Sequence, residues 1–196
     1  AFTSAYSPKG SLLAVGLTNK IVLWDTDTNQ EFATLRQIGR IRSLNFNSDG
    51  TWLSTTTSEG SIHVWDMTQP DLTAPTHKFL QDGRITSLDF NSQKQWLASG
   101  GDDGYVYLWD LATGQEVLRI PHGDSVSGIS FSPDGTVLSS VSRKLVQFWD
   151  VNQMAALKTE TLPEIACARL IRNLTRNEWE LFFNQDEYQM LCPALP

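Results

Sequence analysis

The residues that come nearest to a catalytic motif are Gly128–Ser132, which read GISFS. A serine nucleophile on a sharp strand-to-helix turn needs the pattern G-x-S-x-G, and Ser132 stands where the last glycine belongs. The segment is more typical of a strand. The sequence also lacks the phosphate-binding pattern G-x-x-x-x-G-K-[ST], so an ATPase, if a parent protein carries one, lies outside this chain. We therefore predict that the chain is not an enzyme.

Metal chemistry finds little support either. The chain has three histidines, His63, His77 and His122. Their spacing is not that of zinc ligands. Asp25–Asn29 (DTDTN) is like the start of a calcium loop, but Gln30 occupies the glycine position and Arg36 the position of the bidentate glutamate. A solvated turn after a strand is the better interpretation, and we predict no metal site and no cofactor.

The charge balance disfavours nucleic acid and anionic membranes as partners. The 196-residue chain has 15 Lys and Arg against 22 Asp and Glu, a formal net charge of −7, and contains no basic run. Its apolar runs are too short to span a membrane, and no secretory pattern is visible. Two cysteines, Cys167 and Cys192, are too few for a disulfide scaffold. We expect a cytoplasmic protein, and we interpret a chain that starts at Ala1 as part of a longer one.

The dipeptide Trp-Asp recurs through most of the chain. It occurs at Trp24-Asp25, Trp65-Asp66, Trp109-Asp110 and Trp149-Asp150, at intervals of 41, 44 and 40 residues. A fixed period near 40 indicates a repeat architecture, in which each repeat is one small unit that packs on its neighbours.

Each unit has the same internal order. A first alternating segment ends in an aromatic residue, and a turn such as NSDG or SPDG follows. A second segment, a second turn and the segment that ends in Trp-Asp come next. We expect the first strands at Phe2–Tyr6, Ile41–Phe46, Ile85–Phe90 and Val126–Phe131, and the fourth strands at Glu31–Leu35, Thr76–Leu80, Glu116–Ile120 and Ala156–Glu160. Each unit is therefore predicted to be a four-stranded antiparallel meander.

Four short strands in about 40 residues, with Trp-Asp ending the third, are typical of a propeller blade. On these motifs, residues 1–160 resemble the WD-repeat family. The resemblance implies an all-β propeller, with four blades in this chain. Because the fourth unit has its own outer strand and the first has no preceding neighbour, we expect that these blades do not close on themselves. Further blades or another chain would complete the ring.

The resemblance also implies a side-chain network in each blade, made of a His, a Ser or Thr, an Asp and the Trp. The matching residues are Gln37, Thr55, Glu59 and Trp65 in the second unit, Gln81, Ser99, Asp103 and Trp109 in the third, and His122, Ser140 and Trp149 in the fourth. The first unit offers only Val15 and Trp24. No unit has the full set. We expect Gln37 and Gln81 to replace the histidine through their amides, and the first blade to be held mainly by packing.

Partners of the WD-repeat family commonly dock on the loops that enter the first strand and on the turn before Trp-Asp. The matching candidates for partner binding here are Arg40, Ser58, Asp82, Arg84 and Asp102. Two arginines on neighbouring blades can make bidentate contacts to carboxylates of a partner. The alternative is that they are ordinary solvated charges paired with Asp82 or Asp102.

Residues 161–196 follow a different pattern. Cys167, Leu170, Ile171 and Leu174 are spaced as one face of a helix, and Thr175 with Glu178 forms a capping box that begins a second helix. The tail Ala166–Trp179, with the later CPALP, is similar to one that follows WD repeats in large bacterial, especially cyanobacterial, signalling proteins. Those proteins usually carry an NTPase, caspase-like or kinase domain. We expect a two-helix tail packed on the propeller.

Two functions are compatible with these features. The first is an interaction or sensing module of a larger bacterial signalling protein, which uses a propeller rim to bind a protein or ligand. The second is a structural or autoinhibitory scaffold of a multidomain enzyme, which binds no external ligand.

Overall fold

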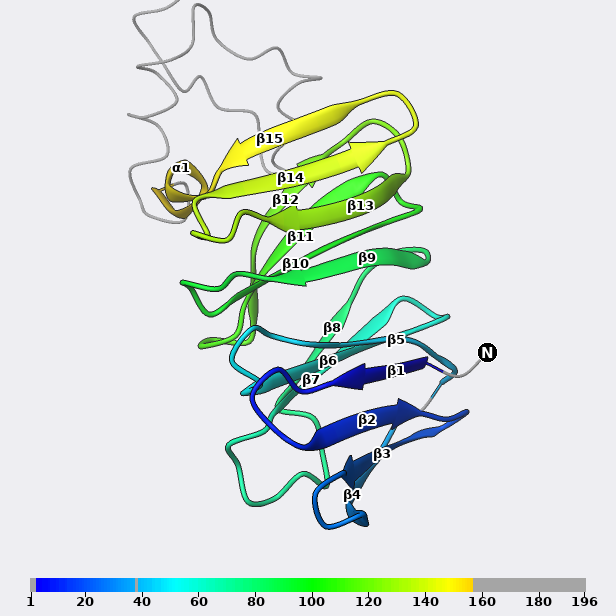
Figure 1. The fold of residues 1–196 in the computed structure, drawn as a ribbon. Helices are drawn as coiled ribbons and strands as arrows, with labels where there is room; N and C mark the ends of the chain where they lie inside the picture. Colours follow the sequence, from blue (N-terminus) through cyan, green and yellow to red (C-terminus); the bar gives the residue numbers. More distant parts are fainter. Residues whose placement is uncertain (1–2, 38, 157–196) are drawn as a thin grey trace, which may run out of the picture.

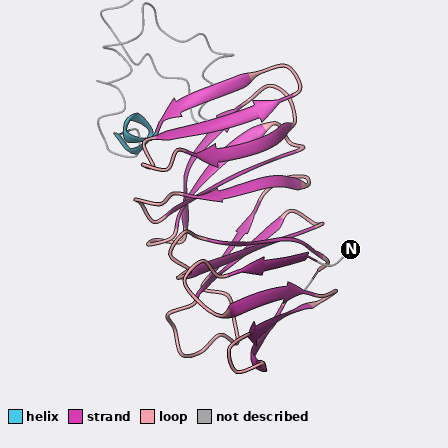
Figure 2. Ribbon diagram, in the orientation of Figure 1, coloured by secondary structure: helices cyan, strands magenta, loops and turns pink. Residues whose placement is uncertain are grey.

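The computed structural model describes residues 3–37 and 39–156, which form four small antiparallel sheets and one short helix (Figures 1 and 2). The all-β prediction is confirmed. The predicted tail at residues 161–196 lies outside the described residues. So does the predicted strand Ala156–Glu160, apart from Ala156, where the helix ends. The domain boundary after residue 160 stays a prediction.

Each sheet is one blade. The first blade contains β1 (Thr3–Tyr6), β2 (Leu12–Gly16), β3 (Lys20–Asp25) and β4 (Gln30–Arg36). The second contains β5 (Ile41–Phe46), β6 (Trp52–Thr57), β7 (Ser61–Asp66) and β8 (His77–Leu80). The third contains β9 (Ile85–Phe90), β10 (Trp96–Gly101), β11 (Tyr105–Asp110) and β12 (Gln115–Pro121). The fourth contains β13 (Val126–Phe131), β14 (Val137–Ser142) and β15 (Val146–Asp150), followed by α1 (Val151–Ala156).

Each Trp-Asp aspartate holds the chain as it leaves the third strand. Asp25 Oδ1 accepts hydrogen bonds from the backbone N–H groups of Asp27 and Thr28, both at 2.9 Å. The hydrogen bond from Thr28 N–H lowers the pKa of Asp25. The same pair of backbone bonds recurs at Asp110 and Asp150, whereas Asp66 accepts from the backbone of Thr68 and the side chain of Gln69. A carboxylate at this position therefore stops the strand and shapes the turn that follows.

The turn between the first and second strands is also repeated. In the second blade, Asp49 Oδ1 accepts from Thr51 N–H at 2.9 Å, and Gly50 adopts a φ of 72°. In the fourth, Asp134 and Gly135 form the same turn, with a φ of 69° at the glycine. A side chain disfavours this left-handed conformation, so glycine suits both positions.

Three apolar clusters hold the blades together, and each lies between two neighbours. The first joins Ile21, Leu23 and Leu35 of the first blade to Leu53 and Trp65 of the second. The second cluster joins the second and third blades, with members including Ile62, Val64, Phe79, Leu97, Tyr107 and Trp109. The third joins the third and fourth blades, with members including Trp96, Ala98, Val106, Leu108, Ile129 and Leu138.

Strand alternation explains how one blade can serve two clusters. On β11, Tyr107 and Trp109 belong to the cluster shared with the second blade, whereas Val106 and Leu108 belong to the cluster shared with the fourth. Successive side chains of a strand point to opposite faces of the sheet. Because both faces of the third blade are covered, β11 is almost wholly buried.

A column of stacked rings crosses from the second blade to the third. It runs through Trp52, His77, Phe79, Trp109 and Tyr107. The centroids of Phe79 and Trp109 are 4.7 Å apart, and the rings of Trp109 and Tyr107 are almost parallel, at 1°. His77 Nε2 also lies 2.7 Å from the backbone oxygen of Leu111. The column therefore joins the two blades by aromatic contacts and a polar one.

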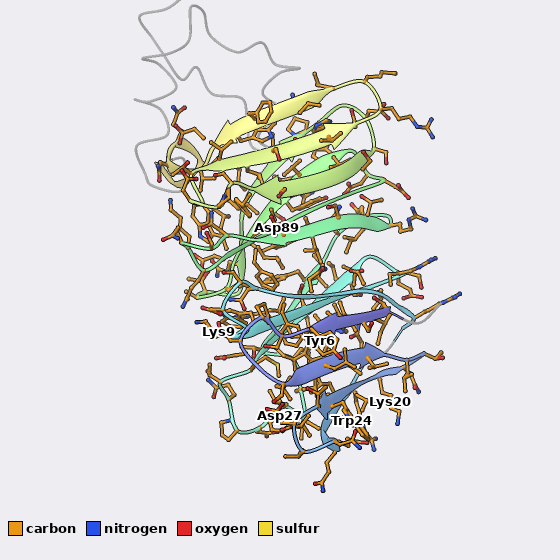
Figure 3. All side chains as sticks on the ribbon, viewed as in Figure 1. Tyr6, Lys9, Lys20, Trp24, Asp27 and Asp89 are labelled. Atoms are coloured by element: carbon orange, nitrogen blue, oxygen red, sulfur yellow. The ribbon has the colours of Figure 1, made fainter. Side chains whose placement is uncertain are left out.

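The third and fourth blades are joined along their first strands as well. Asp89, labelled in Figure 3, lies on β9, and its Oδ2 accepts from Phe131 N–H at 2.7 Å. Ser87 Oγ accepts from Ile129 N–H at 2.9 Å. These bonds use backbone donors of β13, and they hold the two first strands side by side.

The four blades form a row in Figure 1, with the first and the fourth at opposite ends. Exposed large apolar side chains gather in these two end blades. They are Tyr6 and Phe32 in the first blade and Val137, Val141, Leu145, Val146 and Phe148 in the fourth. Leu80 of the second blade is exposed too. The uncovered apolar surface of the described residues thus lies mainly where a blade has one neighbour.

We expect Phe79→Ala to lower the free energy of unfolding by about 3–5 kcal/mol, because it removes a ring that is 4% exposed from the centre of the column. Chemical denaturation measures the loss. Phe32→Ala is the matched control, because Phe32 is 57% exposed, and its effect should stay within about 0.5 kcal/mol. Equal losses for the two variants would contradict the stacked column.

Candidate functional site

The third blade contains a continuous hydrogen-bond network. Trp109 Nε1 donates to Ser99 Oγ at 2.8 Å, and Ser99 Oγ donates to Gln81 Oε1 at 2.8 Å. Gln81 Nε2 then donates to Asp103 Oδ1 at 3.2 Å. The glutamine amide has both an acceptor and a donor. Gln81 can therefore make the two hydrogen bonds, to Ser99 and to Asp103, for which the resemblance implies a histidine. The network ties the loop before β9 to β10, β11 and the turn between them.

Tyr107 adds a fifth member that the sequence analysis missed. Its hydroxyl donates to Asp103 Oδ2 at 2.8 Å, and the Arg119 guanidinium lies 4.8 Å from the centre of its ring. Burial first, and then the hydrogen bond to Asp103, raises the pKa of Tyr107. Its position two residues before Trp109 was the available signal, since alternate residues share a face.

The second blade has only part of this network. Thr55 Oγ1 donates to Gln37 Oε1 at 2.6 Å, but within the part of the chain that the structure describes, Gln37 Nε2 and Trp65 Nε1 have no hydrogen-bond partner. Glu59, which corresponds to Asp103, accepts from Ser58 Oγ at 2.9 Å and is exposed. The expected role of Trp65 as a hydrogen-bond donor was therefore wrong. Thr55 donates as Ser99 does, but its oxygen does not also accept from the indole of Trp65.

The fourth and first blades are simpler. Trp149 Nε1 donates to Ser140 Oγ at 3.0 Å, but neither ring nitrogen of His122 has a hydrogen-bond partner in residues 3–37 and 39–156, contrary to expectation. The turn Ser142–Lys144 contains no acid to accept a proton from that ring. In the first blade, Trp24 Nε1 donates to Asn29 Oδ1 at 3.4 Å, within its own turn.

Four of the candidate binding residues form two pairs, and each pair is joined by a backbone hydrogen bond. Ser58 N–H donates to Arg40 O at 3.1 Å, and Asp102 N–H donates to Arg84 O at 3.0 Å. In the third blade the side chains meet as well, with Arg84 Nε 3.8 Å from Asp102 Oδ2. Ser125, from the loop before the fourth blade, donates to Asp102 Oδ1 at 3.1 Å. We name Arg84, Asp102 and Ser125 the rim cluster.

The other candidates are separate from this cluster. Arg40 and Asp82 are exposed. The raised pKa of Arg119, caused first by its hydrogen bond to Glu116, includes a contribution from the charge of Asp82. The charge of Asp82 thus stabilises the charged form of Arg119 on the outer strand β12. For Arg40, the described residues include no ion-pair partner.

A further arginine lies beside the rim cluster. Arg42, on β5, lines a cavity of about 420 Å³ together with Arg84, Thr86 on β9 and Ser127 on β13. Arg42, Thr86 and Ser127 occupy the second position of their strands. Alignment of the repeats could have identified these three equivalent positions. Arg42 supplies a second guanidinium at the cavity that Arg84 also lines.

Within residues 3–37 and 39–156, no three His, Cys, Asp or Glu side chains gather closely enough to hold a metal ion. In that same part of the chain, no helix has the length and apolar character needed to cross a membrane.

Comparisons with known proteins agree with the repeat pattern. A family model described as "WD domain, G-beta repeat" matches residues 31–66, 72–110 and 114–150. The chain is also 34% identical over 68 residues to the "Retinoblastoma-binding-like protein E" of Dictyostelium discoideum. That match covers 33% of this chain and 13% of the relative, so the chain spans a small part of that protein's length.

We expect Ser99→Ala to lower the free energy of unfolding by about 2–3 kcal/mol, because it leaves both Trp109 Nε1 and Gln81 Oε1 buried without a partner. Ser140→Ala is the comparison variant. It removes the acceptor of a single donor, Trp149 Nε1, so its loss should be about half as large. Urea denaturation of both variants measures this, and an equal or larger loss for Ser140→Ala would disprove the network's role.

Proposed function

Because this chain belongs to the WD-repeat family, we propose that it is a protein-interaction module that binds a partner through the rim cluster. WD repeats generally mediate contacts between proteins, and proteins built from them are typically non-enzymatic scaffolds. The observation that carries the proposal is the half-exposed Arg84 beside Asp102, with side-chain exposures of 54% and 51%.

The geometry of this pair suits a docking role. Its Nε–Oδ2 distance of 3.8 Å leaves the terminal guanidinium nitrogens free to bind a carboxylate of a partner in bidentate fashion. An ion pair this exposed contributes little to stability. Asp102 is held in place by Ser125, and Arg42 lies across the same cavity. The rim cluster and Arg42 together therefore offer two arginines and one fixed carboxylate to an acidic, hydrogen-bonding surface.

The wider setting of this module is part of the proposal. The tail sequence from Ala166 to Pro196 supports a bacterial, cyanobacterial-type signalling protein with an NTPase, caspase-like or kinase domain elsewhere in the parent chain. A cytoplasmic location accords with this setting. Partners would be another protein or other domains of the parent, and not nucleic acid or a membrane, given the net charge of −7.

The exposed apolar surface of the end blades supports a second proposal, which concerns the completion of the ring. We propose that further blades or another chain cover the outer faces of the first and fourth blades and complete a ring. Phe148 is 73% exposed and Val146 is 53% exposed on β15, and Tyr6 is 65% exposed on β1. Apolar side chains of this size gain about 1.5–3 kcal/mol each when they are fully buried, so an uncovered face favours association.

We expect Arg84→Glu to abolish capture of specific protein partners without unfolding the module. The charge reversal places a carboxylate beside Asp102, and because both side chains are half exposed, the free energy of unfolding should change by less than about 1 kcal/mol. The measurement is quantitative mass spectrometry of proteins retained by the immobilised chain, with thermal denaturation in parallel.

Lys9→Glu is the matched control, since Lys9 is exposed on the turn between β1 and β2, at the other end of the strands from the docking loops. Its partner set should equal that of the wild type. If wild type, Arg84→Glu and Lys9→Glu retain the same proteins, the scaffold alternative, which needs no external partner, is favoured. If Arg84→Glu unfolds the chain, Arg84 is structural.

The isolated chain should self-associate through its end blades. Phe148→Lys should lower the average mass measured by light scattering, because it places a charge on the apolar face of β15. Leu80→Lys is the control, since Leu80 is 75% exposed on the second blade, away from the end faces. A wild-type chain that is monomeric at all concentrations would argue against a missing neighbour.

A further inference from the structure

A second cavity lies between the outer strands of the first and second blades. It has a volume of about 930 Å³, within the range of about 300–1,000 Å³ that is usual for small-molecule sites. Its walls come from β3 and β4 on one side and from β7, β8 and the loop between them on the other. It is separate from the rim cluster, which belongs to the third blade and the loop that precedes the fourth.

The cavity gathers positive charge in a chain that is negative overall. Lys20 (labelled in Figure 3) and Arg36 line it from the first blade, and Lys78 lines it from the second. None of the three takes part in an ion pair within the part of the chain that the structure describes. The net charge of the chain is −7, so three unpaired cations at one cavity depart from its general character.

The strand register places these basic side chains directly opposite basic neighbours. Lys20 pairs with Arg36 across β3 and β4, and His63 pairs with Lys78 across β7 and β8. Like charges that face each other across an antiparallel pair are destabilising. Burial first, and then the charge of Lys78, lowers the pKa of His63. The first blade thus keeps two facing like charges on one wall of the cavity, and on the other wall Lys78 faces a histidine whose charged form is disfavoured.

A buried donor without a partner lines the same cavity. Gln37 is only 4% exposed, and its Nε2 group has no hydrogen-bond partner among the described residues. The equivalent amide of the third blade, Gln81, donates to Asp103. In the second blade the corresponding acid, Glu59, bonds to Ser58 instead. A buried N–H group left unsatisfied costs about 1–3 kcal/mol, which an acceptor on a ligand would recover.

Charge and hydrogen bonding together define the ligand. Three cations and the Glu59 carboxylate, which also lines the cavity, amount to a net charge of about +2, and a phosphate monoester carries about −1.5 to −2 with three acceptor oxygens. We propose that this cavity binds the phosphate group of a small phosphorylated molecule, held by Lys20, Arg36 and Lys78 and by the free amide of Gln37. This site is independent of the proposed docking role of the rim cluster.

Calorimetric titration of the 196-residue chain with glycerol phosphate tests the proposal. We expect saturable binding of one molecule per chain. Arg36→Gln and Lys78→Gln should each weaken binding about tenfold, since one charge-assisted hydrogen bond is lost. Neither should lower the melting temperature, because Arg36→Gln removes one of two facing like charges and Lys78 is an exposed side chain. Lys144→Gln is the matched control with the same charge change at a distant turn, and it should bind as the wild type does.

Gln37→Glu is the sharpest variant, because it keeps the acceptor for Thr55 and replaces the free amide with a carboxylate oxygen. It should abolish binding of glycerol phosphate. If it fails to fold, the Arg36 and Lys78 variants still decide the question. Absence of binding by the wild type, or variants that bind as tightly as it does, would overturn the proposal. So would tighter binding of succinate, which indicates a carboxylate site, or of a phosphoserine peptide, which indicates a peptide site.

Discussion

A sheet of four short strands cannot cover its own two faces, and this constraint governs the whole molecule. Every apolar cluster of the described residues lies between neighbouring blades, so each blade completes the core of the next. The second and third blades have a neighbour on both faces. For that reason Trp65, Tyr107 and Trp109 are almost fully buried, whereas Trp24 and Trp149 in the end blades are only half buried. The same dipeptide thus has a different environment in each repeat, set by its position in the row.

The polar network follows this packing and does not replace it. In the third blade, Trp109 is both the first donor of the network and a ring of the aromatic column, so its orientation is fixed twice. In the first blade, Trp24 bonds only within its own turn, and the cluster around Ile21 and Leu23 joins that blade to the second. Buried networks strengthen a fold only when every member is satisfied. The incomplete second-blade network is therefore tolerated because stacking supplies the stability.

The sequence predicted the elements well and their contacts less well. Trp-Asp, the turn residues and strict alternation indicated the strands, because these signals are local. The opposition of Lys20 and Arg36 was not accessible, since it depends on a bulge. The register of β3 and β4 shifts between Leu23 and Trp24, and Phe32 has no partner there. Without that extra residue, Lys20 would face Leu35. The sequence could not show either that Glu59 accepts from Ser58 and not from Gln37. That outcome depends on side-chain rotamers, which are set by packing.

The difference between the second and third blades shows how a repeat can acquire a new role. Gln37 and Gln81 occupy equivalent positions and accept from equivalent hydroxyls on β6 and β10. One amide is completed within the blade by Asp103, and the other is left open beside unpaired cations. The facing charges of Lys20 and Arg36 are exposed and lie outside the apolar clusters. Here the clusters on either side of the second blade are shared with its neighbours, so one repeat can keep locally unfavourable groups where a ligand would satisfy them.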